Sequence, residues 1–105
     1  MKVEYSYKDG RCEATISDNS DWQLFNGVAD AILRNFNGTL VESVDGLEER
    51  YWDIEIATEI VTLHLQHYLG IVLFSQDQGT NDLIGEIGTF LETIEPKKMF
   101  RNGST

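Results

Sequence analysis

The sequence is poor in cysteine, proline and basic side chains, and each shortage excludes a class of protein. Its single cysteine, Cys12, cannot form an internal disulfide bond or build a cysteine-rich metal site. With one proline, Pro96, and no Gly/Ser-rich stretch, the sequence shows no linker, so we expect one domain over residues 1–96. Eight basic against eighteen acidic residues give a net charge of −10, which argues against a nucleic acid as partner.

Long apolar runs are also missing. No stretch approaches the roughly 18 apolar residues of a membrane span, and residues 1–4 do not begin the apolar segment of a signal peptide. We therefore expect a cytoplasmic protein with no membrane partner. Hydrophobic residues still make up 41% of the chain, which is enough to form a folded core.

Charge is distributed unevenly along the chain. All eighteen acidic residues lie at or before Glu95, and with five basic residues they give residues 1–96 a formal charge of −13. Lys97, Lys98 and Arg101 fall in residues 97–105. We expect this basic C-terminal tail to be flexible, because chain ends are often poorly ordered.

Period-two alternation of apolar and polar residues predicts most of the strands. It begins on both sides of Asp9-Gly10, a strong signal for a two-residue hairpin turn. Cys12 falls on the apolar side of this hairpin, where burial would leave its thiol unreactive. Four further strands are predicted over residues 39–45, 50–57, 61–66 and 71–74. The last of these is apolar on both faces, which is typical of a central strand or of a strand with one end covered from both sides.

A first amphipathic helix is predicted over residues 21–36. Ser20 and Gln23 have the spacing of a capping box, and Asn37-Gly38 is a typical helix end. The apolar stripe of this helix consists of Trp22, Phe25, Ala29, Ile32, Leu33 and Phe36.

A second amphipathic helix is predicted over residues 81–95, before Pro96. Gly85 and Gly88 lie within it and lower its helix propensity. We interpret them as points where the helix backbone packs closely on a sheet, with a hinge or a point of ligand contact as the alternative.

The predicted element order is β-β-α-β-β-β-β-α. Both helices can bury their stripes on one face of a mainly antiparallel sheet of about six strands, an α+β two-layer sandwich. The residues expected between helix and sheet are Trp22, Phe25, Trp52, Ile54, Leu63 and Leu65. The other sheet face is expected to carry Glu42, Tyr51, Asp53, Glu55, His64, Gln66 and Tyr68.

Catalytic and metal-binding patterns find little support. The sequence has no G-x-S-x-G motif and no phosphate-binding loop. His64 and His67 lie three apart in a predicted strand and so point to opposite faces, which keeps them from sharing one metal ion. His64 could begin a site with Asp53 or Glu55, or could simply pair with a carboxylate or hydroxyl on the surface. We predict no catalytic residue, no metal and no cofactor.

The acidic residues suggest a binding surface, with an ordinary solvated surface as the alternative. Carboxylates interleaved with tyrosines suit a basic protein partner, because charge steers the encounter and aromatic rings supply buried area. The candidate partner-binding residues are Glu42, Glu48, Glu49, Tyr51, Asp53, Glu55, His64 and Tyr68. If this surface is not used, the helices or the polar loop over residues 75–80 would be the docking site.

Two stretches carry a resemblance to a known group of proteins. They are Tyr51-Trp52-Asp53-Ile54-Glu55-Ile56 and Leu63-His64-Leu65-Gln66-His67-Tyr68-Leu69-Gly70. With the size and acidity of the chain, this pattern resembles the immunity proteins of bacterial polymorphic toxin systems, such as contact-dependent growth inhibition. The resemblance implies a cytosolic α/β protein whose partner is a cognate toxin domain, and it assigns no role to individual residues.

Three hypotheses about function follow. The first is a non-enzymatic inhibitor that binds and neutralises a cationic toxin domain, for example a nuclease. The second is an adaptor or housekeeping module that binds another protein. The third is a small enzyme or metal protein that uses His64 with Asp53 or Glu55.

Overall fold

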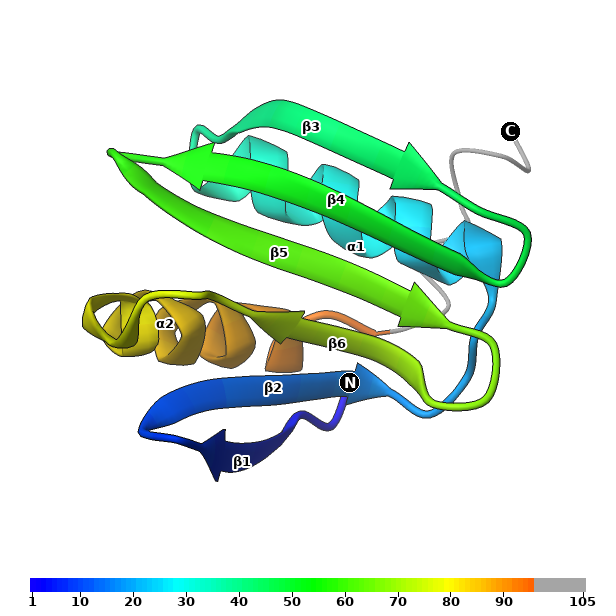
Figure 1. Cartoon of the computed structure of the whole chain (residues 1–105), viewed down its shortest axis with the longest axis horizontal. Helices are drawn as coiled ribbons and strands as arrows, with labels where there is room; N and C mark the ends of the chain where they lie inside the picture. Colours follow the sequence, from blue (N-terminus) through cyan, green and yellow to red (C-terminus); the bar gives the residue numbers. More distant parts are fainter. Residues whose placement is uncertain (96–105) are drawn as a thin grey trace.

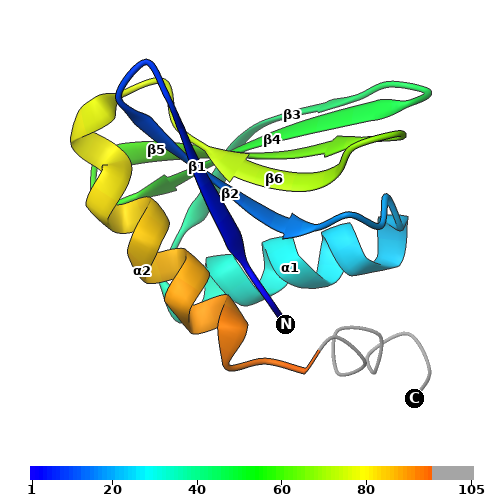
Figure 2. The same ribbon diagram turned by 90° about the horizontal axis from the view of Figure 1, so that it is seen from below.

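The computed structural model describes residues 1–95 and contains one antiparallel sheet with two helices on the same side (Figure 1; Figure 2). Its strands are β1 (Glu4–Lys8), β2 (Arg11–Ser17), β3 (Thr39–Asp45), β4 (Glu49–Ile56), β5 (Glu59–Gln66) and β6 (Gly70–Phe74). Its helices are α1 (Trp22–Asn35), the short 3-10 helix η1 (Gln78–Thr80) and α2 (Asn81–Glu92). The predicted element order and the α+β sandwich are confirmed. The basic tail predicted over residues 97–105 lies outside the described residues.

The sheet order is β1-β2-β6-β5-β4-β3, and every neighbouring pair is antiparallel. Strand β6 lies between β2 and β5, as expected for a strand that is apolar on both faces. Helix α1 carries the chain across the back of the sheet, from β2 to the opposite edge at β3 (Figure 1). Strands β1 and β3 therefore form the two edges.

Two-residue turns hold the long hairpins in register. At the β1–β2 turn, Asp9 and Gly10 have positive φ angles of 53° and 79°, which confirms the predicted hairpin. At the β4–β5 turn, Ala57 and Thr58 also have positive φ angles, of 52° and 84°. Neither residue favours that region of backbone conformation, so the sequence did not indicate so tight a turn here.

The core lies between the helices and one face of the sheet. The largest fully buried side chains are Phe25, Ile16, Ile32, Ile54, Leu63, Leu65, Ile71, Leu73, Ile84, Ile87, Leu91 and Val28. Cys12 is buried in the same cluster, as its place in the alternation predicted. The prediction for Trp22 was wrong, because its side chain is 39% exposed, and Trp52 is only partly buried.

The beginning of α1 also differs from the prediction. The N-cap is Asp21, whose Oδ1 accepts a hydrogen bond of 3.0 Å from the backbone N–H of Leu24. Ser20 instead donates its hydroxyl to the carbonyl oxygen of His67, at 2.8 Å. A carboxylate satisfies a helix N-terminus as well as a hydroxyl does, so spacing alone did not decide between the two neighbours.

The two glycines of α2 have different surroundings. A Cβ atom at Gly88 would overlap the ring and hydroxyl of Tyr5 on β1, which confirms close packing at this point. A Cβ atom at Gly85 would meet nothing within 4 Å, so the same interpretation was wrong there.

Candidate protein-binding face

The sheet face that points away from the helices, called the open face below, collects most of the predicted binding residues. On β4, Ile54 and Ile56 are buried toward the helices, so the alternate residues Tyr51, Asp53 and Glu55 point to the open face. The register then places Tyr51 opposite His64 of β5, and Asp53 between Thr62 of β5 and Glu42 of β3. Residues distant in sequence thus form one continuous acidic and aromatic surface.

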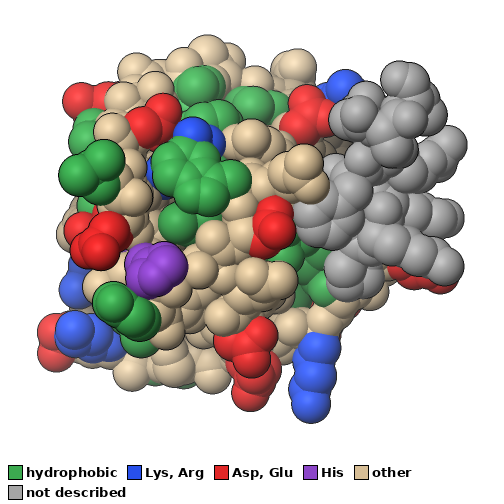
Figure 3. Space-filling model, turned by 90° about the vertical axis from the view of Figure 1, so that its right-hand side faces the viewer, with side chains coloured by type: hydrophobic (Ala, Val, Ile, Leu, Met, Phe, Trp, Pro, Cys, Tyr) green, Lys and Arg blue, Asp and Glu red, His purple; other side chains and the backbone are tan. Residues whose placement is uncertain are grey.

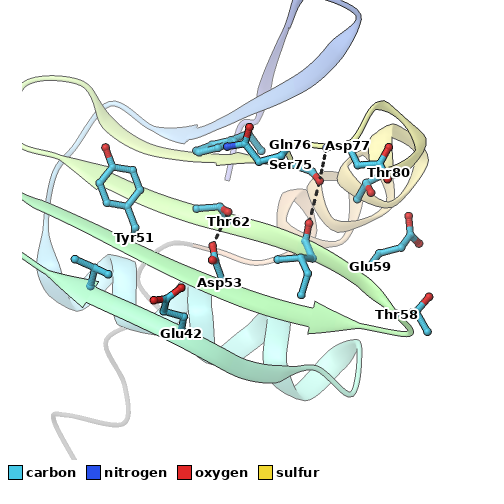
Figure 4. A pocket seen from close by; sticks show the side chains of 13 residues that line it. Glu42, Tyr51, Asp53, Thr58, Glu59, Thr62, Ser75, Gln76, Asp77 and Thr80 are labelled. Atoms are coloured by element: carbon cyan, nitrogen blue, oxygen red, sulfur yellow. Dashed lines mark hydrogen bonds between the residues drawn. The ribbon is translucent and has the colours of Figure 1, made fainter.

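A hollow of about 510 Å³ lies on the open face, beside the β4–β5 turn and the segment that follows β6 (Figure 4). It is lined by Glu42, Val44, Tyr51, Asp53, Thr58, Glu59, Ile60, Thr62, Phe74, Ser75, Gln76, Asp77 and Thr80. Strands β3, β4, β5 and β6 form its floor, and the loop before η1 closes one side. The hollow therefore combines the sheet with the polar loop that the sequence suggested as an alternative docking site.

The lining of this hollow suits a positively charged group. Four carboxylate side chains contribute to it, those of Glu42, Asp53, Glu59 and Asp77, and among residues 1–95 no basic residue lines it. Tyr51, Ile60 and Phe74 add apolar and aromatic surface between the carboxylates. At the margin, Arg11 donates to the Oε1 atom of Gln76 at 3.1 Å.

Hydrogen bonds hold the floor and the loop of the hollow in place. The hydroxyl of Thr62 donates to Asp53 Oδ1 at 2.6 Å, and the hydroxyl of Ser75 donates to the carbonyl oxygen of Ile60 at 2.9 Å. The backbone N–H of Asp77 donates to Ser75 Oγ at 3.2 Å, and Asp77 Oδ1 accepts from the backbone N–H of Gly79 at 2.8 Å. The carboxylates of Asp53 and Asp77 are thus held in position by the protein itself.

Next to the hollow, Tyr51, His64 and Glu49 form a compact cluster. The rings of Tyr51 and His64 are stacked, with centroids 4.1 Å apart and planes 10° apart. The Oε1 atom of Glu49 lies 3.2 Å from His64 Nε2 and accepts from the Tyr51 hydroxyl at 3.3 Å. Partial burial and the neighbouring Glu49 carboxylate raise the pKa of Tyr51 above 10, its ordinary value.

This cluster bears on the hypothesis of a histidine-based site. His64 pairs with a carboxylate, as its surface interpretation predicted, but the partner is Glu49 and not Asp53 or Glu55. Its side chain is only 15% exposed, and His64 does not line the hollow. Within residues 1–95, no three or more His, Cys, Asp or Glu side chains form a group that could hold a metal ion.

The remaining predicted residues lie away from the hollow. Glu55 is exposed on β4, opposite Ile60. Tyr68 is 81% exposed in the β5–β6 turn, and the carbonyl oxygen of Glu48 accepts from the backbone N–H of His67 at 3.0 Å. Glu48 and Tyr68 therefore belong to one end of the sheet, and the surface at this end of the molecule in Figure 3 mixes hydrophobic, acidic, basic and histidine side chains.

Sequence reasoning missed a cluster around Arg50 on the helix side of the sheet. The guanidinium carbon of Arg50 lies 3.2 Å from the centre of the Trp22 ring and 5.6 Å from that of Trp52. Asp45 accepts from Trp52 Nε1 at 2.8 Å and lies 3.4 Å from Arg50 Nε. Trp22 is partly exposed because it covers this arginine and not the centre of the core. Arg50 is thereby occupied and does not neutralise the open face.

Comparisons with protein-family models, with curated proteins and with solved structures found no match to this chain. Among residues 1–95, neither helix combines the length and the apolar character needed to cross a membrane. Function must therefore be argued from the geometry of the open face.

Proposed function

We propose that this chain is a non-enzymatic inhibitor that binds a cationic protein, of the kind found as immunity proteins beside bacterial toxin domains. The observation that carries this proposal is the hollow on the open face, which four carboxylates and no basic side chain line within the described part of the chain. A lysine or arginine side chain fits such a lining, because its stem packs on apolar groups while its head meets carboxylates.

The rest of the open face supports the same proposal. Glu49 and Glu55 extend the negative surface along β4, and Tyr51 supplies a partly exposed ring at its centre. Electrostatic complementarity of this kind speeds encounter with a basic partner, while aromatic side chains contribute buried area. A partner could be blocked at a basic active site, with carboxylates in the place of phosphates, or at a remote surface.

The test is binding of the protein encoded by the neighbouring gene, measured by surface plasmon resonance and, where that protein is toxic, by rescue of growth on co-expression. Asp53→Lys combined with Glu55→Lys should weaken binding by at least about tenfold, because attractive contacts become repulsive. The matched control combines Glu86→Lys with Glu92→Lys. It makes the same change in net charge on exposed positions of α2 and should leave affinity within about threefold.

Salt provides an independent measurement. Association with the wild-type chain should slow as ionic strength rises, because the screening length falls from about 10 Å at 0.1 M to about 3 Å at 1 M. Equal affinity of the wild-type and Asp53→Lys/Glu55→Lys chains would contradict the proposed face. A neighbouring gene without a toxin-like region would count against an immunity role and favour an adaptor.

A further inference from the structure

We propose that a basic strand of the partner pairs with the free edge of β3 and extends the sheet. This inference rests on the proposed function, since it specifies how the cationic partner attaches beside the open face. It begins from the sheet order, which places β3 at one edge, hydrogen-bonded only to β4 among the described elements. All seven residues of β3 are exposed.

The free edge of β3 offers backbone hydrogen-bonding groups at known positions. The backbone N–H of Gly46 donates to the carbonyl oxygen of Glu49 at 2.7 Å. Hydrogen-bonded and non-hydrogen-bonded pairs alternate in an antiparallel ladder. Counting from Gly46 along the register, Val44 and Glu42 also bond to β4, so the N–H and C=O groups of Ser43 and Asp45 point to the free edge.

The side chains of β3 favour pairing with a further strand, because several are apolar and exposed. Leu40, Val41 and Val44 are exposed apolar residues on this one strand, and Leu47 at the following turn is fully exposed. Natural edge strands commonly carry lysine or proline, which discourage pairing with other chains. Strand β3 has neither, and its protection against pairing is limited to a register shift between Leu40 and Glu42 and to acidic residues.

The opposite edge shows the contrast. Strand β1 contains one acidic and one basic residue, Glu4 and Lys8, and its Tyr5 packs against Gly88 of α2. A basic strand would therefore find no excess of negative charge on β1.

Charge selects the occupant of the β3 edge. Glu42 lies opposite Asp53, which places two carboxylates at the point where the edge meets the hollow. Asp45 lies on the other face of β3 and is already paired with Arg50 and Trp52. A second copy of this chain brings a net charge of −10 and the same acidic strand, whereas a strand with alternating lysines can place all of them on the open face, beside Glu42 and Asp53.

The probe is a labelled peptide of eight residues that alternates lysine and valine, with blocked ends, titrated by fluorescence anisotropy at low ionic strength. Ser43→Pro removes one outward N–H group while leaving the ladder to β4 intact, as edge prolines do. We expect the dissociation constant to rise by at least about tenfold, since strand pairing fails near the middle of the edge. Ser43→Ala keeps the N–H group and should bind like the wild-type chain.

Two modified peptides make the test independent of whether the proline variant folds. One is N-methylated at every valine and the other at every lysine, so each loses the N–H groups of one edge only. Strand addition requires that exactly one of them lose binding to the wild-type chain by at least about tenfold. Amide hydrogen exchange at Ser43 and Asp45 should slow on addition of the unmodified peptide.

Each other outcome overturns the inference in a recognisable way. Equal binding of all three peptides, or equal loss of both modified ones, would show that β3 is not extended by a strand. Binding that Asp53→Lys/Glu55→Lys abolishes but Ser43→Pro does not change would contradict the β3 edge and leave the proposed face standing. Binding sensitive to Ser43→Pro but not to the charge reversal would contradict the proposed face. A dimer in analytical ultracentrifugation that Ser43→Pro dissociates would assign the edge to a second copy.

Discussion

The two faces of the sheet are formed by alternate residues of the same strands, yet one face packs against the helices and the other carries acidic and aromatic groups. On β5, Val61, Leu63 and Leu65 are buried against the helices, while Thr62 and His64 lie on the open face. The covered face is apolar and closely packed, and the open face holds carboxylates, a hollow and a stacked Tyr–His pair. The buried apolar contacts that stabilise the fold lie on the covered face. The open face can therefore hold charged groups, which would be costly to bury in the core.

The largest expected difference between the faces is at neighbouring positions on β5. Leu63→Ala should lower the free energy of unfolding by about 3 kcal/mol, because the fully buried side chain leaves a cavity between sheet and helices. His64→Ala, one residue along on the open face, should cost less, about 1 kcal/mol, because it removes the stacking on Tyr51 and the contact with Glu49 but opens no cavity between sheet and helices. Chemical denaturation measures both values, and equal losses would break the division between the faces.

A smaller difference is expected one strand away, between Trp52 and Tyr51. Trp52 packs edge-on against Phe25, with ring centroids 5.1 Å apart, but it is only partly buried. Trp52→Ala should therefore cost about 2 kcal/mol, less than the 3–5 kcal/mol typical of a fully buried tryptophan. Tyr51→Ala serves as the open-face comparison and should cost about 1 kcal/mol or less. A larger loss for Tyr51→Ala than for Trp52→Ala would contradict this account.

The glycines of α2 sharpen the description of the covered side. Gly85→Ala should raise the free energy of unfolding by about 1 kcal/mol, because alanine favours the helix and its methyl group meets open space. Gly88→Ala should lower it, because the new methyl group displaces Tyr5. Thermal unfolding measures both, and Tyr5→Phe in the Gly88→Ala chain should recover part of the loss. An equal gain at both positions would show that β1 does not pack on α2 here.

The smallest expected effect concerns alkaline pH and the open face alone. The raised pKa of Tyr51 means that the folded chain keeps the phenol proton at a pH where the unfolded chain has lost it. This contribution to stability is fully present below about pH 10 and is lost as pH rises through the pKa of the folded state. Tyr51→Phe should therefore flatten the decline of the unfolding free energy above pH 10. An unchanged slope in denaturation experiments would contradict the interaction with Glu49.

Much of the fold was predictable because local signals and burial agree. The alternation around Asp9-Gly10 placed the first hairpin, and the apolar run at residues 71–74 indicated the central position of β6. The prediction fails where two adjacent residues are equally suited to the same structural role, as at the N-terminus of α1. Asp21 and Ser20 are both good N-caps, and only the packing of Ser20 against the β5–β6 turn decides between them.

The candidate site was less predictable because it joins residues from four strands and a loop. Alternation correctly assigned Glu42, Tyr51 and Asp53 to one face, and all three line the hollow. Glu59 and Asp77 were not singled out, because Glu59 begins β5 directly after the tight turn and Asp77 lies in a loop, so no clear periodicity indicates where their side chains point. The pairing of β4 with β5 and the path of the loop after β6 bring Glu59 and Asp77 to the same hollow as Asp53. The local sequence does not indicate that these residues lie close together.

The sequence by itself determined most of the buried positions, because side chains alternate every second residue in a strand and repeat every 3.6 residues in a helix, although Trp22 was an exception. It also determined the excess of acidic charge. The tertiary structure alone decided that four carboxylates surround one hollow, that Glu49 and not Asp53 pairs with His64, and that β3 is left at an open edge. These arrangements depend on strand order and register, which arise from contacts between residues far apart in the chain.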